Sequence, residues 1–598
     1  MLTTISERVS ALRHYLETHH LDAFILPTAD PHLGEYQSED LLRVTWLSGF
    51  HGENCMVIVT RDKAGIFVDG RFTVQVKQEV PDSVYEYGDI TCDDPKAWLT
   101  DRLPSGSCIA IDASLFGIKW YQEAKAFFEH KGCELVSLPE NPVDLLWEDR
   151  PAAPCGPIEL FTGSAFSCFV KRDRVSAQII KSGQDALLLT QPEDVNWLLN
   201  IRGCDIPFVR TAMSFALVQK NGSVDVFIDT DRLPEGFYQH TGEGVNAHNM
   251  AMMPSILEER VKSLPRIQLD PEQTNAWLYN LLVDAGAIPE FALCPVAWKR
   301  GCKEGIELEG MRAAHIQDGI AMCRFLAWLD GQVKDGCEQD ECTLADKLQQ
   351  SREGVEGFVD NSFACISAIG PNAAMCHYEP EPTTARKLGQ DGMYLIDSGG
   401  HYQLKGDLYG TTDITRTVKV GSVSDEQRRR YTQVLQGHIA LDDARFMPGT
   451  TGMQLDTVTR LPLWKEGINF NHGTGHGIGH FLSVHEFPPR INTNNPYGAL
   501  EEGMCVSNEP GYYLEDGYGI RIENILAVRK AGDVNISMLA FEHLTFVPID
   551  TRLLMPELLS GSEKAWINQY HQEVYEKIAP FLNEEETVWL KKATELVA

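Results

Sequence analysis

Two strand-like segments in the last third of the chain decide the fold. Residues 393–400 read MYLIDSGG, and residues 410–417 read GTTDITRT. The first segment is an apolar run that ends in Asp397 just before a turn, and the second alternates β-branched and polar residues around Asp413. Short apolar runs and period-two alternation are typical of β-strands. We therefore expect Asp397 at the end of a buried strand and Asp413 within a second strand.

Three further segments carry side chains of the kinds that bind metals. Residues 471–480 read NHGTGHGIGH, residues 508–512 read NEPGY, and residues 519–524 read GIRIEN. We expect Glu509 between a strand and a turn, and Glu523 within another alternating strand.

The histidines do not follow the usual zinc patterns. His472, His476 and His480 are separated by glycines, each of which costs about 1 kcal/mol in a helix relative to alanine, so we do not expect a helical three-histidine site. His485 is followed by Glu486 and then by FPP, so the HExxH pattern of zinc proteases is absent.

Together the segments supply an oxygen-rich ligand set. Four carboxylates buried side by side repel one another strongly unless cations neutralise them. Two divalent ions would match the four negative charges, and oxygen ligands favour ions such as Mn²⁺ or Mg²⁺. Such a pair of ions makes hydroxide available at neutral pH, which indicates metal-assisted hydrolysis. The candidate ligands are Asp397, Asp413, His476, Glu509 and Glu523.

The front half of the chain contains a weak internal repeat. The tetrapeptide RVSA at 8–11 recurs at 174–177, and the apolar runs DAFIL at 22–26 and DALLL at 185–189 follow the two copies. Two copies of a helix-then-strand order at long spacing indicate duplicated α/β domains, whereas a solenoid has short periods and several copies.

Breaks in the pattern divide the chain into three predicted domains. A proline-rich stretch lies at 148–154, and a second break near 299–303 precedes a predicted long amphipathic helix over 306–333. We therefore expect α/β domains at 1–155 and 156–304. A catalytic domain at 305–598 would follow, with a helical tail in which Trp566, Tyr570, Val574 and Ile578 share one face.

Composition excludes several classes of partner. The formal net charge of −33 argues against a nucleic-acid binder and against docking on an anionic membrane. The sequence contains no run of about 18 apolar residues, so no membrane span is predicted. The 15 cysteines are scattered without a C-x-x-C motif, which favours a reducing compartment, and we expect a cytoplasmic protein.

The five candidate ligands, in these local contexts, resemble those of the dinuclear pita-bread metallopeptidases. The resemblance extends to IGPNAAMCHY at 369–378 and to VHE at 484–486, and the whole chain is similar to the long, three-domain cytosolic aminopeptidases P. It implies two duplicated creatinase-like α/β domains followed by a pita-bread catalytic domain, a mixture of α/β and α+β architecture.

The resemblance also implies roles for the ligands. Asp397 would chelate one metal ion, Asp413 and Glu523 would bridge both ions, and His476 and Glu509 would bind the other. Glu509 would also act as general base. The ions would be Mn²⁺, with Zn²⁺ or Co²⁺ as alternatives.

Five more residues match the family in position. His377 and His485 would flank the scissile bond, and His472 would line the pocket or serve as a structural histidine of its glycine-rich loop. Tyr513 and Arg521 would support the ligands, or belong to ordinary strand packing and an ion pair.

The implied reaction removes the N-terminal residue from peptides whose second residue is proline. An X-Pro bond has no N–H, so an enzyme that holds substrates through that group loses a contact, which a pocket for the proline ring restores. The alternatives are a prolidase, which cuts only X-Pro dipeptides, and a non-catalytic peptide-binding relative. The resemblance also implies a homodimer.

Asp397 and Asp413 lie sixteen residues apart, farther than the two aspartates usually stand in this family. A hairpin turn around 403–408 would absorb the extra residues at small entropic cost. Asp407 is a rival ligand by count alone, but its Lys-Gly-Asp context is that of a turn, so we favour Asp413.

Overall fold

The computed structural model describes residues 2–389, 391–493, 498–532 and 537–598, which form two compact units. The first unit comprises Met1–Phe161 and Phe166–Val296, and the second comprises Thr162–Ala165 and Ala297–Ala598. The boundaries of the three predicted domains, at 155/156 and 304/305, stay a prediction.

The first unit contains two six-stranded sheets with the same topology. In each, the first strand lies at the centre, antiparallel to the second strand and parallel to the fifth. This shared order confirms the predicted duplication. One sheet runs β4-β3-β2-β1-β5-β6, with β1 Ala23–Pro27, β2 Cys55–Thr60, β3 Ala64–Val68, β4 Glu86–Asp89, β5 Cys108–Ile111 and β6 Glu134–Ser137. The other runs β12-β11-β10-β8-β13-β14, with β8 Ala186–Leu189, β10 Phe215–Gln219, β11 Val224–Phe227, β12 Val245–His248, β13 Arg266–Leu269 and β14 Ile288–Phe291.

The repeated RVSA segments lie in equivalent helices, α1 (Ile5–Thr18) and α7 (Cys168–Lys181). Helix α1 begins with a capping box between Thr4 and Glu7, which satisfies backbone donors at its first turn. The other helices are α2 Arg43–Ser48, α3 Gln75–Glu79, α4 Pro95–Thr100, α5 Ile118–His130, α6 Pro142–Leu146, α8 Pro192–Leu199, α9 Phe237–Thr241, α10 Met253–Val261 and α11 Ala276–Asp284. A two-stranded pair joins β7 Glu159–Leu160 to β9 Ile201–Arg202.

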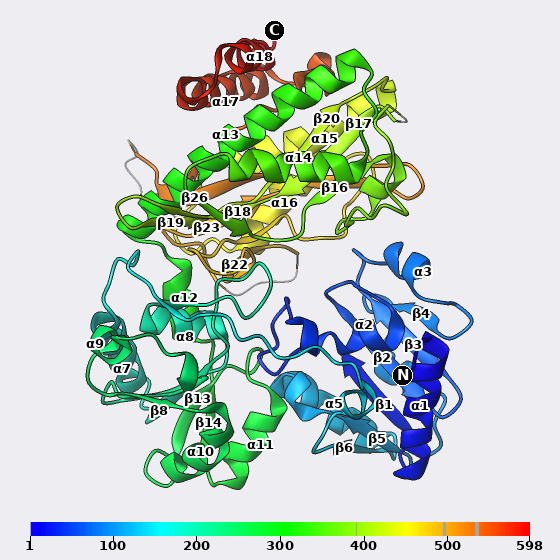
Figure 1. Ribbon diagram of the computed structural model, residues 1–598, viewed down its shortest axis with the longest axis vertical. Coiled ribbons are helices and arrows are strands. Elements are labelled where there is room, and N and C mark those ends of the chain that lie inside the picture. The colour runs from blue at the N-terminus through cyan, green and yellow to red at the C-terminus, as the bar shows by residue number, and fades with distance from the viewer. Residues whose placement is uncertain (1, 390, 494–497, 533–536) are drawn as a thin grey trace. The chain divides into compact units, whose positions relative to one another are not determined.

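A long helix, α13 (Ile306–Asp335), crosses the second unit and confirms the helix predicted over 306–333 (Figure 1). Two of its three internal glycines, Gly310 and Gly319, permit close packing. A Cβ on Gly310 would lie 2.1 Å from the carbonyl oxygen of Tyr409, and one on Gly319 would lie 2.9 Å from that of Phe546. Glycine at these positions therefore lowers helix propensity but permits close contact with β19 and with the segment that follows β27.

The strands of the second unit form small, mostly antiparallel sheets. They are ordered β15-β18-β19, β16-β17-β20, β22-β21-β23-β26-β27 and β24-β25. Their bounds are β15 Phe358–Asn361, β16 Ile366–Ile369, β17 Met393–Ser398, β18 Gly400–Leu404, β19 Leu408–Thr411, β20 Ile414–Lys419, β21 Gly475–Gly477, β22 Glu486–Ile491, β23 Cys505–Asn508, β24 Gly511–Leu514, β25 Tyr518–Arg521, β26 Asn524–Lys530 and β27 Leu539–His543. The accompanying helices are α14 Glu341–Glu353, α15 Asp425–Asp442, α16 Gly452–Trp464, α17 Gly561–Ile578 and α18 Glu584–Ala593. Helix α12, Pro295–Gly301, includes the boundary between the two units.

The C-terminal tail is helical, as predicted. Tyr570, Val574 and Ile578 of α17 are fully buried, and Trp566 stacks on Tyr570 with 5.3 Å between ring centroids. Helices α17 and α18 both contact α13 (Figure 1). The tail is therefore an integral part of the core of this unit.

The residues around 403–408 form the predicted hairpin, since β18 and β19 pair antiparallel with Leu404 opposite Leu408. A four-residue strap, Thr162–Ala165, belongs to this second unit. Thr162 Oγ1 donates to Asp407 Oδ1 at 2.8 Å, and Ser164 Oγ donates to Glu307 Oε1 at 3.1 Å. A Cβ on Gly163 would lie 2.2 Å from the ring of Tyr409. The strap thus lies directly on the hairpin.

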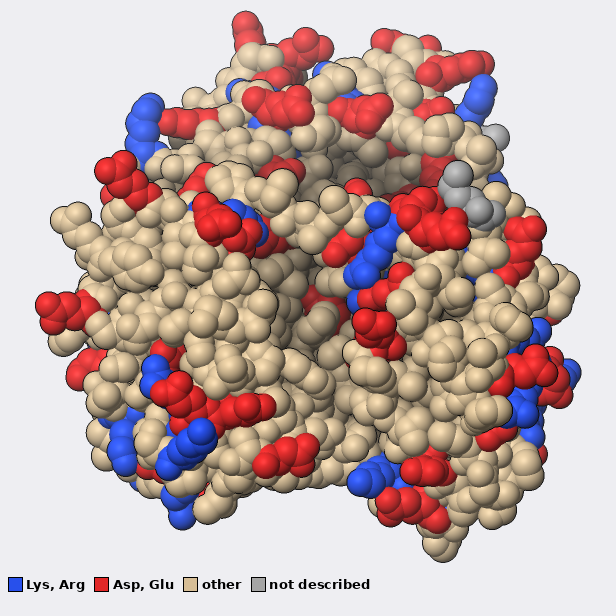
Figure 2. Space-filling model, turned by 60° about the horizontal axis from the view of Figure 1, so that its bottom comes forward, with Lys and Arg blue, Asp and Glu red and all other residues tan. Residues whose placement is uncertain are grey.

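Acidic side chains are spread over the visible surface, with Lys and Arg among them (Figure 2). On this face the acidic side chains are distributed rather than gathered in one patch. Among the described residues, none of the helices has the length and apolar character needed to cross a membrane.

Candidate metal centre

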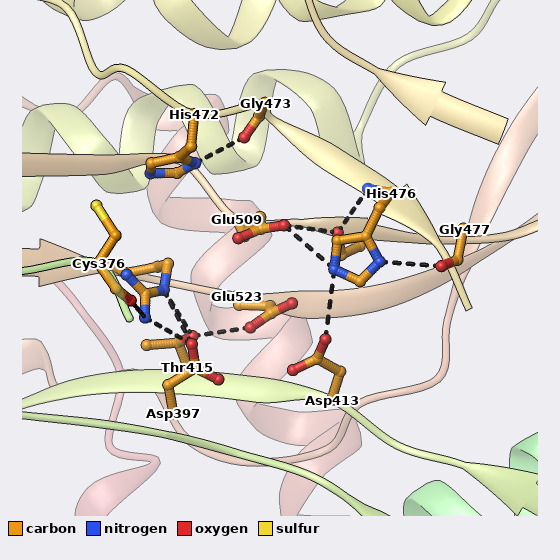
Figure 3. Close-up of polar contacts among 12 residues, drawn as sticks. Cys376, Asp397, Asp413, Thr415, His472, Gly473, His476, Gly477, Glu509 and Glu523 are labelled. Atoms are coloured by element: carbon orange, nitrogen blue, oxygen red, sulfur yellow. Dashed lines mark hydrogen bonds and ion pairs between the residues drawn. The ribbon is translucent and has the colours of Figure 1, made fainter. Parts of the chain in front are cut away.

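Two of the candidate carboxylates lie at junctions where the chain passes from one sheet to another. Asp413 lies between β19 and β20, and Glu523 lies between β25 and β26. The prediction that each lies within a strand is therefore wrong. Where strand pairing is interrupted, a side chain can leave the alternating pattern of its neighbours. Here the carboxylates of Asp413 and Glu523 both point to the same centre (Figure 3).

The remaining candidate ligands occupy the expected contexts. Asp397 is the last but one residue of β17, His476 is the middle residue of β21, and Glu509 follows β23. Backbone contacts align these elements, because Glu523 N donates to Thr415 O at 3.1 Å and Glu509 N donates to Thr474 O at 2.8 Å.

The five side chains converge. Ligand atoms of Asp413, His476 and Glu523 all lie within 4.8 Å of one another. Nε2 of His476 lies 3.4 Å from Asp413 Oδ2 and 3.4 Å from Glu509 Oε1. Nδ1 of His476 donates to the carbonyl oxygen of Gly477 at 2.9 Å, so the lone pair lies on Nε2 and faces the carboxylates (Figure 3).

The electrostatics of this cluster are unfavourable without a cation. Burial raises the pKa of Asp413 well above its usual range, and the charge of Asp397 raises it further. Burial, together with the charges of Asp413 and Glu509, likewise raises the pKa of Glu523. Burial also raises the pKa of Glu509, although His476 opposes this shift. Neighbouring carboxylates cannot all ionise in such a site unaided.

Two carboxylate oxygens of the site are left available to a cation. Asp397 Oδ1 and Glu523 Oε1 are buried and have no hydrogen-bond partner among the described residues. A buried polar atom without a partner costs about 1–3 kcal/mol, and more when it is charged. Carboxylate oxygens and one imidazole are ligands for a hard divalent ion, so the residues fit a metal centre.

A series of hydrogen-bonded side chains, Arg521, Tyr513 and His472, supports Asp397. Arg521 Nη2 donates to Asp397 Oδ2 at 2.6 Å, and its Nη1 donates to Tyr513 OH at 2.7 Å. Tyr513 OH in turn lies 2.9 Å from Nε2 of His472, whose Nδ1 donates to Gly473 O. Burial and the charge of Arg521 lower the pKa of His472, so it is neutral and accepts from Tyr513. His472 is thus linked to Asp397 through two intervening side chains.

The other two histidines have different surroundings. The ring of His485 packs edge-on against that of His476, with 4.2 Å between centroids. His377 lies in the loop that follows β16, where the preceding carbonyl, that of Cys376, accepts from Arg521 Nη2 at 3.3 Å.

Two hydroxyl residues that hold the ligands were not predicted from the sequence. Thr415 Oγ1 donates to Glu523 Oε2 at 2.8 Å, and Ser507 Oγ donates to Glu509 Oε1 at 3.0 Å. Thr415 stands two residues after Asp413, and Ser507 stands two residues before Glu509. The period of two was an available signal only for Ser507, because Thr415 binds Glu523, which is distant in the sequence, and Asp413 lies outside the strands.

Comparison with known proteins identifies the parts of the chain. Residues 309–530 match metallopeptidase family M24, and residues 537–597 match the C-terminal region of that family. Residues 8–145 and 149–307 each match a creatinase/prolidase N-terminal domain.

Full-length relatives are also found. The chain is 35% identical to a probable Xaa-Pro aminopeptidase P of Coprinopsis cinerea over 98% of each chain. It is 34% identical to aminopeptidase P2 of Arabidopsis thaliana, over 99% of this chain and 89% of the relative. Among solved structures, an X-prolyl aminopeptidase from Caenorhabditis elegans, described as a cytosolic enzyme with a di-nuclear active site, has 33% identity and a TM-score of 0.94 over the whole of both chains. This protein belongs to the aminopeptidase P family of M24 metallopeptidases.

Proposed function

We propose that the protein is a metal-dependent aminopeptidase that releases the N-terminal residue from peptides with proline in the second position. The observation that carries the proposal is the buried cluster of Asp413, His476 and Glu523, whose ligand atoms lie within 4.8 Å of one another. Glu509 lies 3.4 Å from His476, the charge of Asp397 acts on the other carboxylates, and two carboxylate oxygens of the site have no partner among the described residues. Relatives that match over nearly the full length are X-Pro aminopeptidases, which supports this substrate class over the dipeptides of a prolidase.

Two divalent ions would be held by Asp397, Asp413, His476, Glu509 and Glu523, with Asp413 and Glu523 shared between them. When bound, the ions polarise the scissile carbonyl and lower the pKa of a water molecule. Similarity to the enzyme with a di-nuclear site supports two ions. We propose Mn²⁺ because oxygen ligands predominate, with Zn²⁺ and Co²⁺ as alternatives.

Glu509 is the proposed general base. Ser507 holds one of its carboxylate oxygens at 3.0 Å, which orients the group for proton transfer. Glu509 would take a proton from the attacking water and deliver it to the proline nitrogen. The leaving group is a secondary amine, so protonation is required for its departure.

His377 and His485 are proposed to contact the substrate on either side of the scissile bond. His485 packs against the ligand His476, and His377 precedes Tyr378 in the loop beside Arg521. Each offers a ring N–H that would bind a developing negative charge on the carbonyl oxygen. Arg521, Tyr513 and His472 act indirectly, because their hydrogen-bonded chain fixes the orientation of Asp397.

Peptide hydrolysis tests the proposal. Metal-stripped protein is loaded separately with Mn²⁺, Zn²⁺ or Co²⁺ and incubated with an X-Pro dipeptide and an X-Pro-Y tripeptide, and products are followed by mass spectrometry. We expect release of the first residue from the tripeptide. Cleavage of the dipeptide alone identifies a prolidase. Metal and peptide binding without cleavage identifies a non-catalytic relative.

We also propose that the protein forms a homodimer. Helix α16 and the turn before it expose an apolar row that a single chain leaves uncovered: Met447, Met453, Val458, Leu461 and Trp464. Patches of this kind are typical of association surfaces. Light scattering of the wild type and of Leu461→Arg tests this, with a dimer expected for the first and a monomer for the second.

A cytoplasmic location is the corresponding proposal for the cell. All 15 cysteines are free thiols in the structure, which suits a reducing compartment, and the similar enzyme from Caenorhabditis elegans is described as cytosolic. Cell fractionation tests it.

A further inference from the structure

The side chain of Glu341, the first residue of α14, is fully buried and is the centre of a hydrogen-bond cluster. Four donors of one downstream segment, residues 369–386, converge on its carboxylate. They are Ile369 N at 2.5 Å, Asn372 Nδ2 at 2.8 Å, Tyr378 OH at 2.9 Å and Arg386 N at 2.8 Å. Two are backbone amides and one is an amide side chain, so these three groups can only donate, and the four hydrogen bonds oppose the rise in the pKa of Glu341 that burial causes.

These contacts secure a loop that has little regular structure of its own. After β16 ends at Ile369, the segment forms a short 3₁₀ turn over Gly370–Ala374 and then continues without strand pairing to Tyr378. Glu341 binds the segment at its start, in its middle and at its end. A single carboxylate therefore takes the place of the backbone ladder that fixes a strand.

The opposite side of the same loop rests against the metal centre. A Cβ on Gly519 of β25 would lie 1.7 Å from Ala373 O, so the two backbones are in direct contact. Cys376 O accepts from Arg521, which also binds Asp397 (Figure 3). The loop is thus held between Glu341 and the ligand cluster, and His377 lies in the part that is held.

We propose that Glu341 is a positioning residue that fixes His377 for contact with the substrate, through its hydrogen bonds to the loop and to the adjacent Tyr378. The inference rests on the proposed function, in which His377 binds the peptide. A displacement of about 1 Å at a reacting site can cost about 100-fold in rate, so the rigidity of this loop has a direct effect on turnover.

Glu341→Gln tests the assignment, because the amide keeps the size of the side chain but turns an NH₂ group toward donors. We expect kcat on an X-Pro-Y peptide to fall by about 10- to 100-fold with a smaller change in KM. Metal content per chain stays at the wild-type value, because no ligand is altered. Glu338→Gln is the matched control, since Glu338 lies near the same segment, pairs with Lys387 at 3.4 Å and is exposed. It keeps wild-type kcat.

A double-mutant cycle separates positioning from a merely structural role. His377→Ala removes the group that Glu341 is proposed to fix, so adding Glu341→Gln to His377→Ala causes no further loss of kcat. Tyr378→Phe removes one of the four donors and gives a smaller loss with the same dependence on His377, which keeps the test available if Glu341→Gln fails to fold.

Losses that multiply in the double variant overturn the inference, and so does wild-type kcat in Glu341→Gln. Wild-type kcat in His377→Ala overturns the role of His377 and with it that of Glu341. Absence of X-Pro-Y cleavage by the metal-loaded wild type overturns the proposed function itself.

Discussion

Nη2 of Arg521 lies 2.6 Å from Oδ2 of Asp397, while Oδ1 of the same carboxylate has no hydrogen-bond partner within the described ranges. The arginine therefore fixes one oxygen and leaves the other directed at the candidate metal centre. Supporting contacts of this kind orient a ligand before the metal binds, and their loss typically costs about 10- to 100-fold in metal affinity or activity.

Arg521→Lys is expected to weaken metal binding by about 10- to 100-fold. Lysine keeps the charge but loses the fork that reaches Asp397, Tyr513 and Thr415 together. Metal content after dialysis against buffered Mn²⁺ measures the effect. Arg529→Lys, on the exposed end of β26, is the control and keeps full metal content. Equal metal content in the two variants would contradict the supporting role of Arg521.

Alanine variants of Asp413 and of Asp407 test the ligand assignment. Asp413→Ala is expected to abolish metal binding and activity, because its carboxylate lies 3.4 Å from His476 in the converging cluster. Asp407→Ala is expected to leave both metal binding and activity largely intact, because Asp407 lies in the hairpin turn and its side chain accepts a hydrogen bond from Thr162. Elemental analysis of the purified variants distinguishes them, and the reverse pattern would overturn the assignment.

Metal removal is expected to lower thermal stability. Without cations, Asp413, Glu509 and Glu523 repel one another in a buried site, and an ion that binds only the folded chain stabilises it by about 2.7 kcal/mol at 100 times its Kd. The melting temperature should fall after EDTA treatment and recover when Mn²⁺ is restored. The same cycle applied to Asp413→Ala should leave the melting temperature unchanged. A wild type that melts identically with and without metal would argue against the centre.

His543 gives the C-terminal tail a pH-dependent contribution to stability. Its Nε2 lies 2.7 Å from Asp442 and its Nδ1 lies 3.0 Å from Glu573 of α17. Burial lowers the pKa of His543, but the two carboxylates outweigh burial and raise it to about 10. The folded chain therefore binds this proton more tightly than the unfolded chain. The contribution is complete below about pH 6.5 and declines as the pH rises through 10.

Chemical denaturation at pH 7 and pH 10 measures this effect. The wild type is expected to lose a few kcal/mol of unfolding free energy over this interval, and His543→Gln is expected to lose less, because the neutral amide has no proton to release. An identical pH dependence in both proteins would show that the ion pairs contribute nothing.

The duplicated front half and the long helix were predictable because their signals are local. Apolar runs mark β1 and β8, and the spacing of Ile316, Ile320 and Cys323 marks α13. The identities of the five converging residues were accessible for a different reason. Carboxylates and a histidine next to glycines, turns and strands stand out in an apolar sequence. The family resemblance indicates which of them act together as ligands.

The exact positions of Asp413 and Glu523 were not predictable. Each stands where the chain leaves one sheet and enters another, and the alternating pattern continues on both sides of the break. A change of sheet is set by long-range pairing, which periodicity does not record. Glu341 was missed for a related reason. An acid in the first turn of a helix is ordinarily a solvated residue that interacts with the helix dipole, and its bonds to a loop about thirty residues later depend on tertiary contacts.

The strap at Thr162–Ala165 limits how this enzyme can be recombined. Although these residues come from the front half of the chain, they pack on Asp407, Tyr409 and Glu307 of the catalytic unit. A chimera that exchanges the first three hundred residues for those of another protein would also exchange this cover and leave the hairpin facing foreign side chains. The catalytic unit is therefore incomplete without Thr162–Ala165, and we expect only chimeras that retain this segment to be active.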